Sequence, residues 1–203
     1  DIGVDDISFT PSCTLQTQST LPTTVPPVTG TPPCNATHSQ CLTTTSQCIP
    51  NDAFCNFYID CKDQTDELAC PLACNFEQKS LCQWTNDKKQ KLQWDFGSGN
   101  TASSDTGPSY DHTTHSINGT YIYLETSTGF TGDSARLISP LYRKSSKTCM
   151  FTFWYHMFGA TIDTLNIHIR AGGMDALIWS LKGSQGKDWL QGIAYLPTCS
   201  ITI

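Results

Sequence analysis

The chain of 203 residues carries a net charge of −6 and 11 cysteines, and its length predicts one or two domains. Its only basic run, formed by Lys88, Lys89 and Lys91, is too small to neutralise a row of phosphates, which excludes nucleic-acid binding. No apolar run approaches the roughly 20 residues that cross a bilayer.

The cysteines and two glycosylation motifs indicate an oxidising, extracellular environment. Eight cysteines lie between Cys34 and Cys82, and none forms the close CxxC pair that zinc sites favour. Asn35 and Asn118 each begin an N-x-T pattern and are candidate acceptors for N-linked glycans. Because these cysteines require secretion and no signal peptide begins the chain, we expect a processed or partial chain.

The first 33 residues contain a strand and a spacer. Residues 1–13 alternate apolar and polar side chains as a strand does, and they end in a cysteine. A single strand cannot form a domain, so we expect it to be the end of a domain that lies upstream. Residues 14–33 hold seven Thr and five Pro without an apolar period, which predicts an extended, disordered linker that invites O-linked glycans.

Residues 34–70 form a six-cysteine segment with the spacing C-x6-C-x6-C-x6-C-x5-C-x8-C. Its last third carries the acidic residues Asp60, Asp63, Asp66 and Glu67. A segment this short buries too little apolar surface to fold alone, so disulfides or a metal have to supply stability. The pattern predicts a disulfide-linked, calcium-loaded binding module, although spacing alone leaves fifteen cysteine connectivities open.

Residues 74–203 have a different character, with tryptophans and short runs of alternating polarity. In the run 165–170, Leu and Ile occupy one face while Asn, His and Arg occupy the other, which is typical of a half-buried strand. Turn residues bound these runs, and no convincing helix interrupts them. The region is therefore predicted to form an antiparallel β-sandwich.

The six-cysteine segment resembles the low-density-lipoprotein receptor class A family. The resemblance covers all of 34–70 and is carried by CIP at 48–50 and CNFYIDCKDQTDE at 55–67. It implies three disulfides: Cys34–Cys48, Cys41–Cys61 and Cys55–Cys70.

The same resemblance implies a calcium site. The family's side-chain ligands match Asn56, Asp60, Asp66 and Glu67, and its backbone ligands match Ala53 and Tyr58. The family usually has aspartate where Asn56 stands, so we expect an affinity below that of a site with four carboxylates. Millimolar extracellular calcium still loads such a site.

Residues 74–203 resemble the MAM family, named for meprin, the neuropilin A5 antigen and a receptor tyrosine phosphatase. The matching motifs are CNFE at 74–77, CQW at 82–84, TGPSYDHT at 106–113, YIYLE at 121–125, ARLISP at 135–140, FWYHMFG at 153–159 and LNIHIR at 165–170. The resemblance implies a jelly-roll β-sandwich and a disulfide between Cys74 and Cys82.

One family motif is out of place in this chain. The DDISFTPxC strand that usually closes a MAM domain stands at 5–13, so residues 1–13 look like the end of a preceding copy, while the copy at 74–203 stops without its closing strands. Three cysteines, Cys13, Cys149 and Cys199, then remain for one bond. We hypothesise that residues 1–13 fill the vacant strand position and that Cys13 bonds Cys149.

No constellation for catalysis is visible, and we expect no enzyme. His112 and His115 do not have the spacing of a zinc-protease helix. We expect three histidines, His112, His156 and His168, to pack or hydrogen-bond rather than to catalyse. Asp105, Asp111 and Asp133 are candidates for a second cation site, because some MAM domains bind ions.

The sequence thus predicts a mainly β, non-catalytic fragment of a larger extracellular protein, secreted or part of an ectodomain. Its function would be adhesion or matrix scaffolding, with a calcium-stabilised module and a sandwich presented to extracellular protein ligands rather than to a small-molecule substrate. Two alternatives remain open: an accessory region of a membrane-anchored protease, and the ectodomain of an endocytic cargo receptor.

Overall fold

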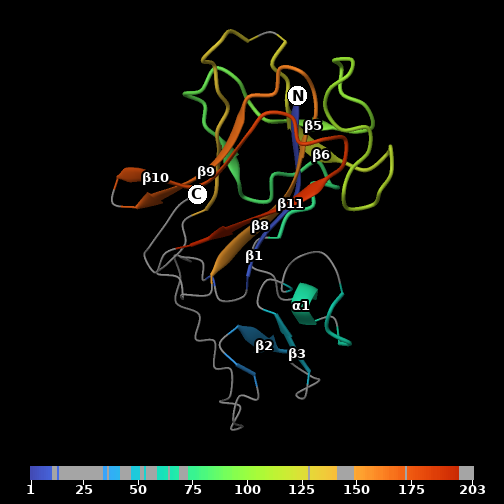
Figure 1. Cartoon of the computed structure of the whole chain (residues 1–203), viewed down its shortest axis with the longest axis vertical. Helices are drawn as coiled ribbons and strands as arrows, with labels where there is room; N and C mark the ends of the chain where they lie inside the picture. Colours follow the sequence, from blue (N-terminus) through green and yellow to red (C-terminus); the bar gives the residue numbers. More distant parts are fainter. Residues whose placement is uncertain are drawn as a thin grey trace.

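The computed structural model describes residues 1–10, 13, 34–35, 37–41, 47–50, 53, 59–63, 65–68, 73–127, 129–140, 149–171 and 173–196, although not the side chains of Glu67 and Leu68. Figure 1 shows a large body rich in strands and a small module that contains β2, β3 and α1. Within these ranges, no helix has the length and apolar character to span a membrane.

The large body is built on a five-stranded antiparallel sheet with the order β11-β8-β1-β6-β5 (Figure 1). Its strands are β1 (Ile2–Phe9), β5 (Asp95–Gly97), β6 (Tyr121–Leu124), β8 (Met150–Met157) and β11 (Leu190–Tyr195).

Two separate two-stranded sheets, β9 with β10 and β4 with β7, complete the sandwich. Side chains from β9 enter the same hydrophobic core as those of the large sheet, with Leu165 and Ile169 buried while Asn166 is exposed. The predicted alternation of this strand and the mainly β sandwich are therefore confirmed. The bounds of these strands are β4 (Thr85–Asn86), β7 (Leu137–Ile138), β9 (Thr164–Ala171) and β10 (Met174–Lys182).

Strand β1 lies at the centre of the sheet, antiparallel to β6 on one edge and to β8 on the other. Its register against β8 shifts between Asp5 and Ser8, and Asp6 has a φ of 47°. Such a β-bulge inserts one residue and reverses which face later side chains occupy. The bulge thus lets Ile7 and Phe9 enter the core together with the earlier apolar residues of β1.

A disulfide joins Cys13 to Cys149, as hypothesised from the sequence, with the two Cα atoms 5.0 Å apart. Both cysteines are buried in the sandwich core. Just before Cys13, the N–H of Thr10 donates to the carbonyl of Met150 at 3.0 Å, which extends the pairing of the two segments. Strand β1 and Cys13 are thus fixed to β8 and its preceding cysteine, the first by a ladder and the second by a covalent bond. Cys199 lies outside the described residues.

The small module contains β2 (His38–Gln40), which pairs with β3 (Cys48–Pro50), and the short helix α1 (Thr65–Leu68). Its buried core is small and consists of Cys41, Ile49 and Cys61, with Ala53 packed against them. Disulfides connect Cys34 with Cys48 and Cys41 with Cys61 in this module, and Cys74 with Cys82 in the sandwich. These are pairs that the family resemblances imply.

Candidate functional site

The acidic loop of the module is organised around the buried carboxylate of Asp66. This residue stands in the first turn of α1, and its side chain is 0% exposed. Its Oδ2 accepts hydrogen bonds from the N–H of Asp60 at 2.6 Å and from the N–H of Cys61 at 3.0 Å. A buried carboxylate requires compensating charge or hydrogen bonds, and the loop backbone provides two such bonds.

Neighbouring side chains fix the same loop from outside. Gln47 Nε2 donates to the carbonyl of Asp60 at 2.8 Å, and Gln47 Oε1 accepts from the N–H of Lys62 at 3.1 Å. Asp63 Oδ1 accepts from both the N–H and the hydroxyl of Thr65, at 3.1 and 2.6 Å, and so caps α1. Asp63 therefore has a local structural role.

The structure describes half of the residues implied as calcium ligands. Ala53, Asp60 and Asp66 lie in one small module, whereas Asn56, Tyr58 and the side chain of Glu67 lie outside the described residues, as does the implied Cys55–Cys70 bond. The described donors are oxygen atoms, the ligands that calcium prefers. They fit a hard cation, and the buried position of Asp66 fits a ligand better than it fits a solvated acid.

A second close group is not a metal site. The ligand atoms of Cys41, Cys61 and Asp63 lie within 4.8 Å of one another. However, Cys41 and Cys61 are joined in a disulfide. Their sulfur atoms are therefore not the thiolates that bind metal.

In the sandwich, the bulge of β1 turns two buried acids toward the loop at 111–113. Asp5 accepts hydrogen bonds from the N–H of Asp6 at 2.9 Å and from the N–H of His112 at 2.8 Å. Asp6 contacts Nδ1 of His112 at 2.6 Å and accepts the hydroxyl of Thr113 at 2.6 Å. Burial, together with the adjacent charge of Asp6, raises the pKa of Asp5 to about 9.

Two further acids, the buried Asp111 and the half-buried Glu77, lie close to this group. Asp111 is 0% exposed, and its oxygens accept the N–H and hydroxyl of Thr114 and the N–H of Ser116, at 2.5, 2.9 and 2.8 Å. Burial and the nearby Asp111 raise the pKa of Glu77, whose Oε1 accepts the N–H of Thr120 at 2.8 Å. A Cβ at Gly119 would overlap the Asp111 carboxyl, so only glycine allows this approach.

The comparisons with known proteins follow this division of the chain. The model of the MAM domain, meprin/A5/mu, matches residues 74–200. The chain belongs to the MAM family. The model of the low-density lipoprotein receptor domain class A matches residues 32–70, directly before the MAM domain.

The relatives of this MAM chain are much longer proteins. Human MAM domain-containing glycosylphosphatidylinositol anchor protein 1 is 38% identical over 61% of the chain and 14% of its own length. Neuropilin-1 of Mus musculus is 38% identical over 56% of the chain and 12% of its own length, and that of Xenopus laevis is 30% identical over 87% and 20%. The chain therefore corresponds to a small part of each, and it is extracellular or part of an ectodomain.

Two histidines of the MAM domain, His112 and His156, have structural partners. His112 stacks on Trp154 with ring centroids 3.7 Å apart, and its Nδ1 contacts the carboxylate of Asp6. His156 contacts the carbonyl of Lys187 through Nε2 at 3.0 Å, and burial lowers the pKa of His156. Both residues thus hold loops against the outer face of β8. The acid pair Asp5 and Asp6 was not predicted to bind this loop; two acids within an apolar strand were the available signal.

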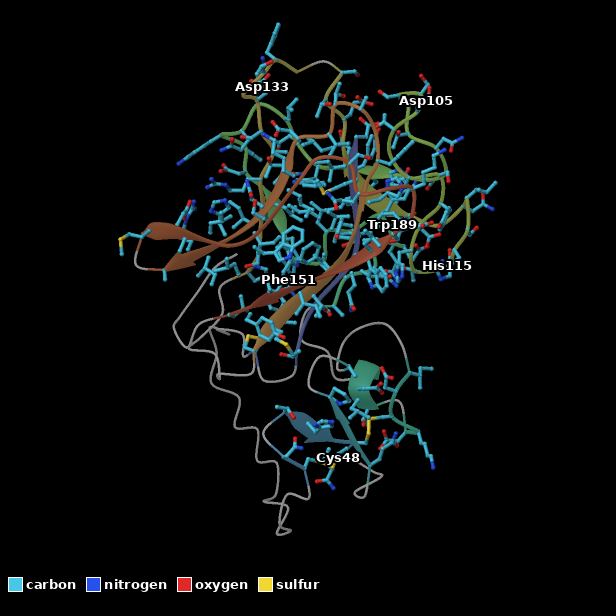
Figure 2. The ribbon with its side chains drawn as sticks, viewed as in Figure 1. Cys48, Asp105, His115, Asp133, Phe151 and Trp189 are labelled. Carbon is cyan, nitrogen blue, oxygen red and sulfur yellow. A yellow bond between two sulfur atoms is a disulfide. The ribbon has the colours of Figure 1, made fainter. Side chains whose placement is uncertain are left out.

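The three acids suggested for a second cation site do not form one. Asp133 forms an ion pair with Lys91 at 3.0 Å, and Asp111 binds its own loop. Asp105 is exposed, and Figure 2 shows it on a different loop from Asp133. Among the described residues, none of the three belongs to a group of metal-binding side chains with ligand atoms within 4.8 Å. The sequence did not specify that these acids lie on separate loops.

Both predicted glycosylation positions lie on the surface. Asn35 and Asn118 are exposed. The side chain of Asn35 accepts hydrogen bonds from the N–H and the hydroxyl of Thr37 at 3.1 and 2.9 Å. The second motif ends at Thr120, which is buried. Access to the acceptor nitrogen is therefore compatible with glycosylation, which stays a prediction.

Proposed function

We propose that this chain is a non-catalytic, extracellular adhesion or scaffold fragment that presents a calcium-stabilised class A module and a MAM sandwich to protein ligands. The family assignments and the extracellular relatives support binding rather than any defined reaction. We further propose that residues 1–13 are the closing strand of a MAM fold and that 14–33 act as a spacer between folded units.

We propose that the edge of the sandwich formed by β10 is a binding surface for a protein ligand. Strand β10 pairs with β9 and, over the described residues, with no other strand (Figure 1). Its apolar side chains Met174 and Leu177 are 76% and 55% exposed. A strand with a free edge and exposed apolar side chains is suited to contact another protein, which would cover both.

Ion pairs connect side chains on and beside this hairpin. Asp175 contacts Arg170 at 2.6 Å and Arg136 at 3.3 Å. The hydrogen bond from Arg170 lowers the pKa of Asp175 to about 2, so this carboxylate stays ionised at every physiological pH. A rigid hairpin loses little conformational freedom when a ligand binds, which favours affinity.

Calcium has a structural role in the proposal. Asn56, Asp60, Asp66 and Glu67 would contribute side-chain oxygens, and Ala53 and Tyr58 would contribute carbonyl oxygens. When bound, the ion supplies the positive charge that holds these oxygens together. The backbone around Asp60 and Asp66 is already ordered by hydrogen bonds, which supports a rigid module that displays a constant surface.

The binding surface is tested with substitutions on β10. Met174→Ser combined with Leu177→Ser should weaken attachment of cells, or of basement-membrane extract, to the immobilised chain by about 30-fold, because removal of an interface hot spot costs about 2 kcal/mol. Ile117→Ser is the matched control, since Ile117 is 70% exposed but lies on a different loop. Equal attachment by all three proteins would contradict a role for β10.

Two whole-protein contexts compete with a scaffold. A protease domain in the full-length reading frame would make the chain an accessory region, and a transmembrane helix with a sorting tail would make it part of an endocytic receptor. Further MAM and class A repeats would favour the scaffold. The flanking reading frame therefore tests all three.

A further inference from the structure

The central strand of the large sheet is remote in sequence from the rest of that sheet. Strand β1 lies between β6 and β8, whereas the remainder of the sandwich starts at Cys74. All eight residues of β1 are buried, and its backbone pairs with both neighbours. The segment 14–73, which includes the class A module, separates the strand from the sheet that it completes.

The position between β6 and β8, here called the strand slot, is specific for the sequence of β1. In the core, Phe9 packs on Phe151 with ring centroids 4.9 Å apart. On the other face, Asp5 accepts a hydrogen bond from the N–H of His112. The slot also ends at Cys149, which bonds the cysteine that follows β1. Backbone pairing, side-chain shape and a covalent bond thus select one peptide.

We propose that the strand slot also accepts β1 from a second copy of this chain, so that two copies exchange strands and become joined by Cys13–Cys149 bonds. Every contact of β1 is the same whether the strand and the slot belong to one copy or to two. The choice then depends on the chain concentration relative to the effective concentration of the tethered strand, which is on the order of millimolar for a flexible tether. Strand exchange is thus favoured where the local concentration of the chain is high. Once formed, the intermolecular disulfide keeps the two copies joined after dilution.

The covalent step is an ordinary disulfide oxidation. The thiols of Cys13 in one copy and Cys149 in the other each lose a proton, and their electron pair reduces one oxidised glutathione to two glutathione thiols. The same oxidant forms the bond within one copy. The proposal therefore needs no reagent beyond those of the secretory pathway.

Complementary cysteine variants test the exchange directly. Full-length Cys13→Ala and Cys149→Ala chains, with different tags and in a Cys199→Ser background, are refolded together in a glutathione buffer. Neither variant can form the bond internally, but the second has Cys13 on its strand and the first has Cys149 in its slot. We expect a disulfide-linked pair that contains both tags, and a Cys13–Cys149 peptide that spans them.

The control prevents β1 from docking in the strand slot but keeps the thiol of Cys13. Phe9→Asp in the Cys149→Ala chain places a charge in the aromatic core, so the linked pair should fall at least tenfold. Variants refolded singly should give no such pair. If both variants show dispersed proton spectra and remain unlinked when mixed, the proposal is wrong, and a pair that survives Phe9→Asp is an unspecific cross-link that also overturns it.

A mixture of isotopically heavy and light unmodified chains gives a second test that does not depend on folding of the variants. Linked Cys13–Cys149 peptides with one heavy and one light partner should be about 100-fold more abundant after refolding at roughly 200 μM than at roughly 2 μM. Peptides with matched labels alone at both concentrations would show that the strand always closes its own sandwich.

Discussion

The class A module and the MAM sandwich are stabilised in different ways. The described core of the module consists of Cys41, Ile49 and Cys61, so covalent bonds pass through the middle of it. The sandwich instead has an aromatic core, in which Phe151 packs against Phe9, and the disulfide of Cys13 fixes the end of β1 to this core. The module depends on bonds and an expected ion, whereas the sandwich depends on apolar packing around a strand supplied from elsewhere in the chain.

This difference gives the two parts separate weak points. Removal of the ion should affect only the module, and removal of the Cys13 tether should affect only the sandwich. All five tryptophans lie in the sandwich, between Trp84 and Trp189. Tryptophan fluorescence therefore reports on the sandwich alone, while backbone amide spectra report on both parts.

The largest expected effect is complete unfolding of the module without its ion. Chelation by EDTA, or Asp66→Ala, should collapse the amide resonances of 34–70 and expose its disulfides to reductant, because the buried carboxylate and its loop lose their organising charge. Tryptophan emission should not change. Asp63→Asn is the matched control, since it keeps the oxygen that caps Thr65 and removes only a charge. Module spectra that ignore chelation would reject the calcium assignment.

The next effect is on the sandwich. Replacement of both Cys13 and Cys149 by Ala should lower its free energy of unfolding by about 4–5 kcal/mol, because the bond closes a loop with a sequence separation of 136 residues. Urea denaturation followed by tryptophan fluorescence measures this loss. The Cys34→Ala, Cys48→Ala pair should leave that transition unchanged. A loss below about 1 kcal/mol would indicate that packing alone holds β1 in place.

Sequence reasoning predicted the pieces of this sandwich better than their contacts. The strand character of residues 165–170 and the place of β1 in the sheet followed from polarity patterns and a displaced family motif. The bulge at Asp6 did not follow, because an inserted residue looks like a break in alternation until the partner strand is known. Asp5 also accepts a hydrogen bond from the N–H of His112, which lies more than 100 positions away, and local sequence does not encode such a contact.

In the class A module, the predicted contacts came from the family resemblance rather than from the residue pattern. Its cysteine pairs came from the family resemblance, since their spacing left many connectivities open. The burial of Asp66 was also unspecified by the sequence, because an acid after a cysteine resembles any solvated loop. The three acids offered for a second cation site share only their residue type, and the fold places Asp105 and Asp133 on separate loops.

A smaller effect is expected from crowding the sandwich core. Gly192 of β11 faces the ring of Phe153, and a Cβ at this position would overlap that ring. Gly192→Ala should therefore destabilise the sandwich by about 1–3 kcal/mol. Combination with Phe153→Leu should recover part of the loss, because the smaller side chain leaves room for the methyl group. Strictly additive effects in the two variants would contradict direct contact.

A further effect is a pH dependence that belongs to the sandwich. The pKa of Asp5 is raised from 3.8 to about 9, so between these values the folded chain holds a proton that the unfolded chain releases. Stability is then highest below about pH 4 and falls as the pH rises toward 9, because the folded chain has to keep a proton that the unfolded chain has already released. Urea midpoints from tryptophan fluorescence at pH 5 and 7.5, measured in EDTA, test this slope.

The sign of that slope separates two opposing influences on Asp5. Burial and the charge of Asp6 favour the protonated acid, whereas the N–H groups of Asp6, His112 and Thr113 favour the carboxylate. Asp5→Asn removes the titration and keeps one acceptor oxygen, so the slope should flatten if burial dominates. If stability instead rises between pH 5 and 7.5 in the unmodified chain, the amide bonds outweigh burial, and the bulge of β1 acts as an anion cradle rather than as a site for a neutral acid.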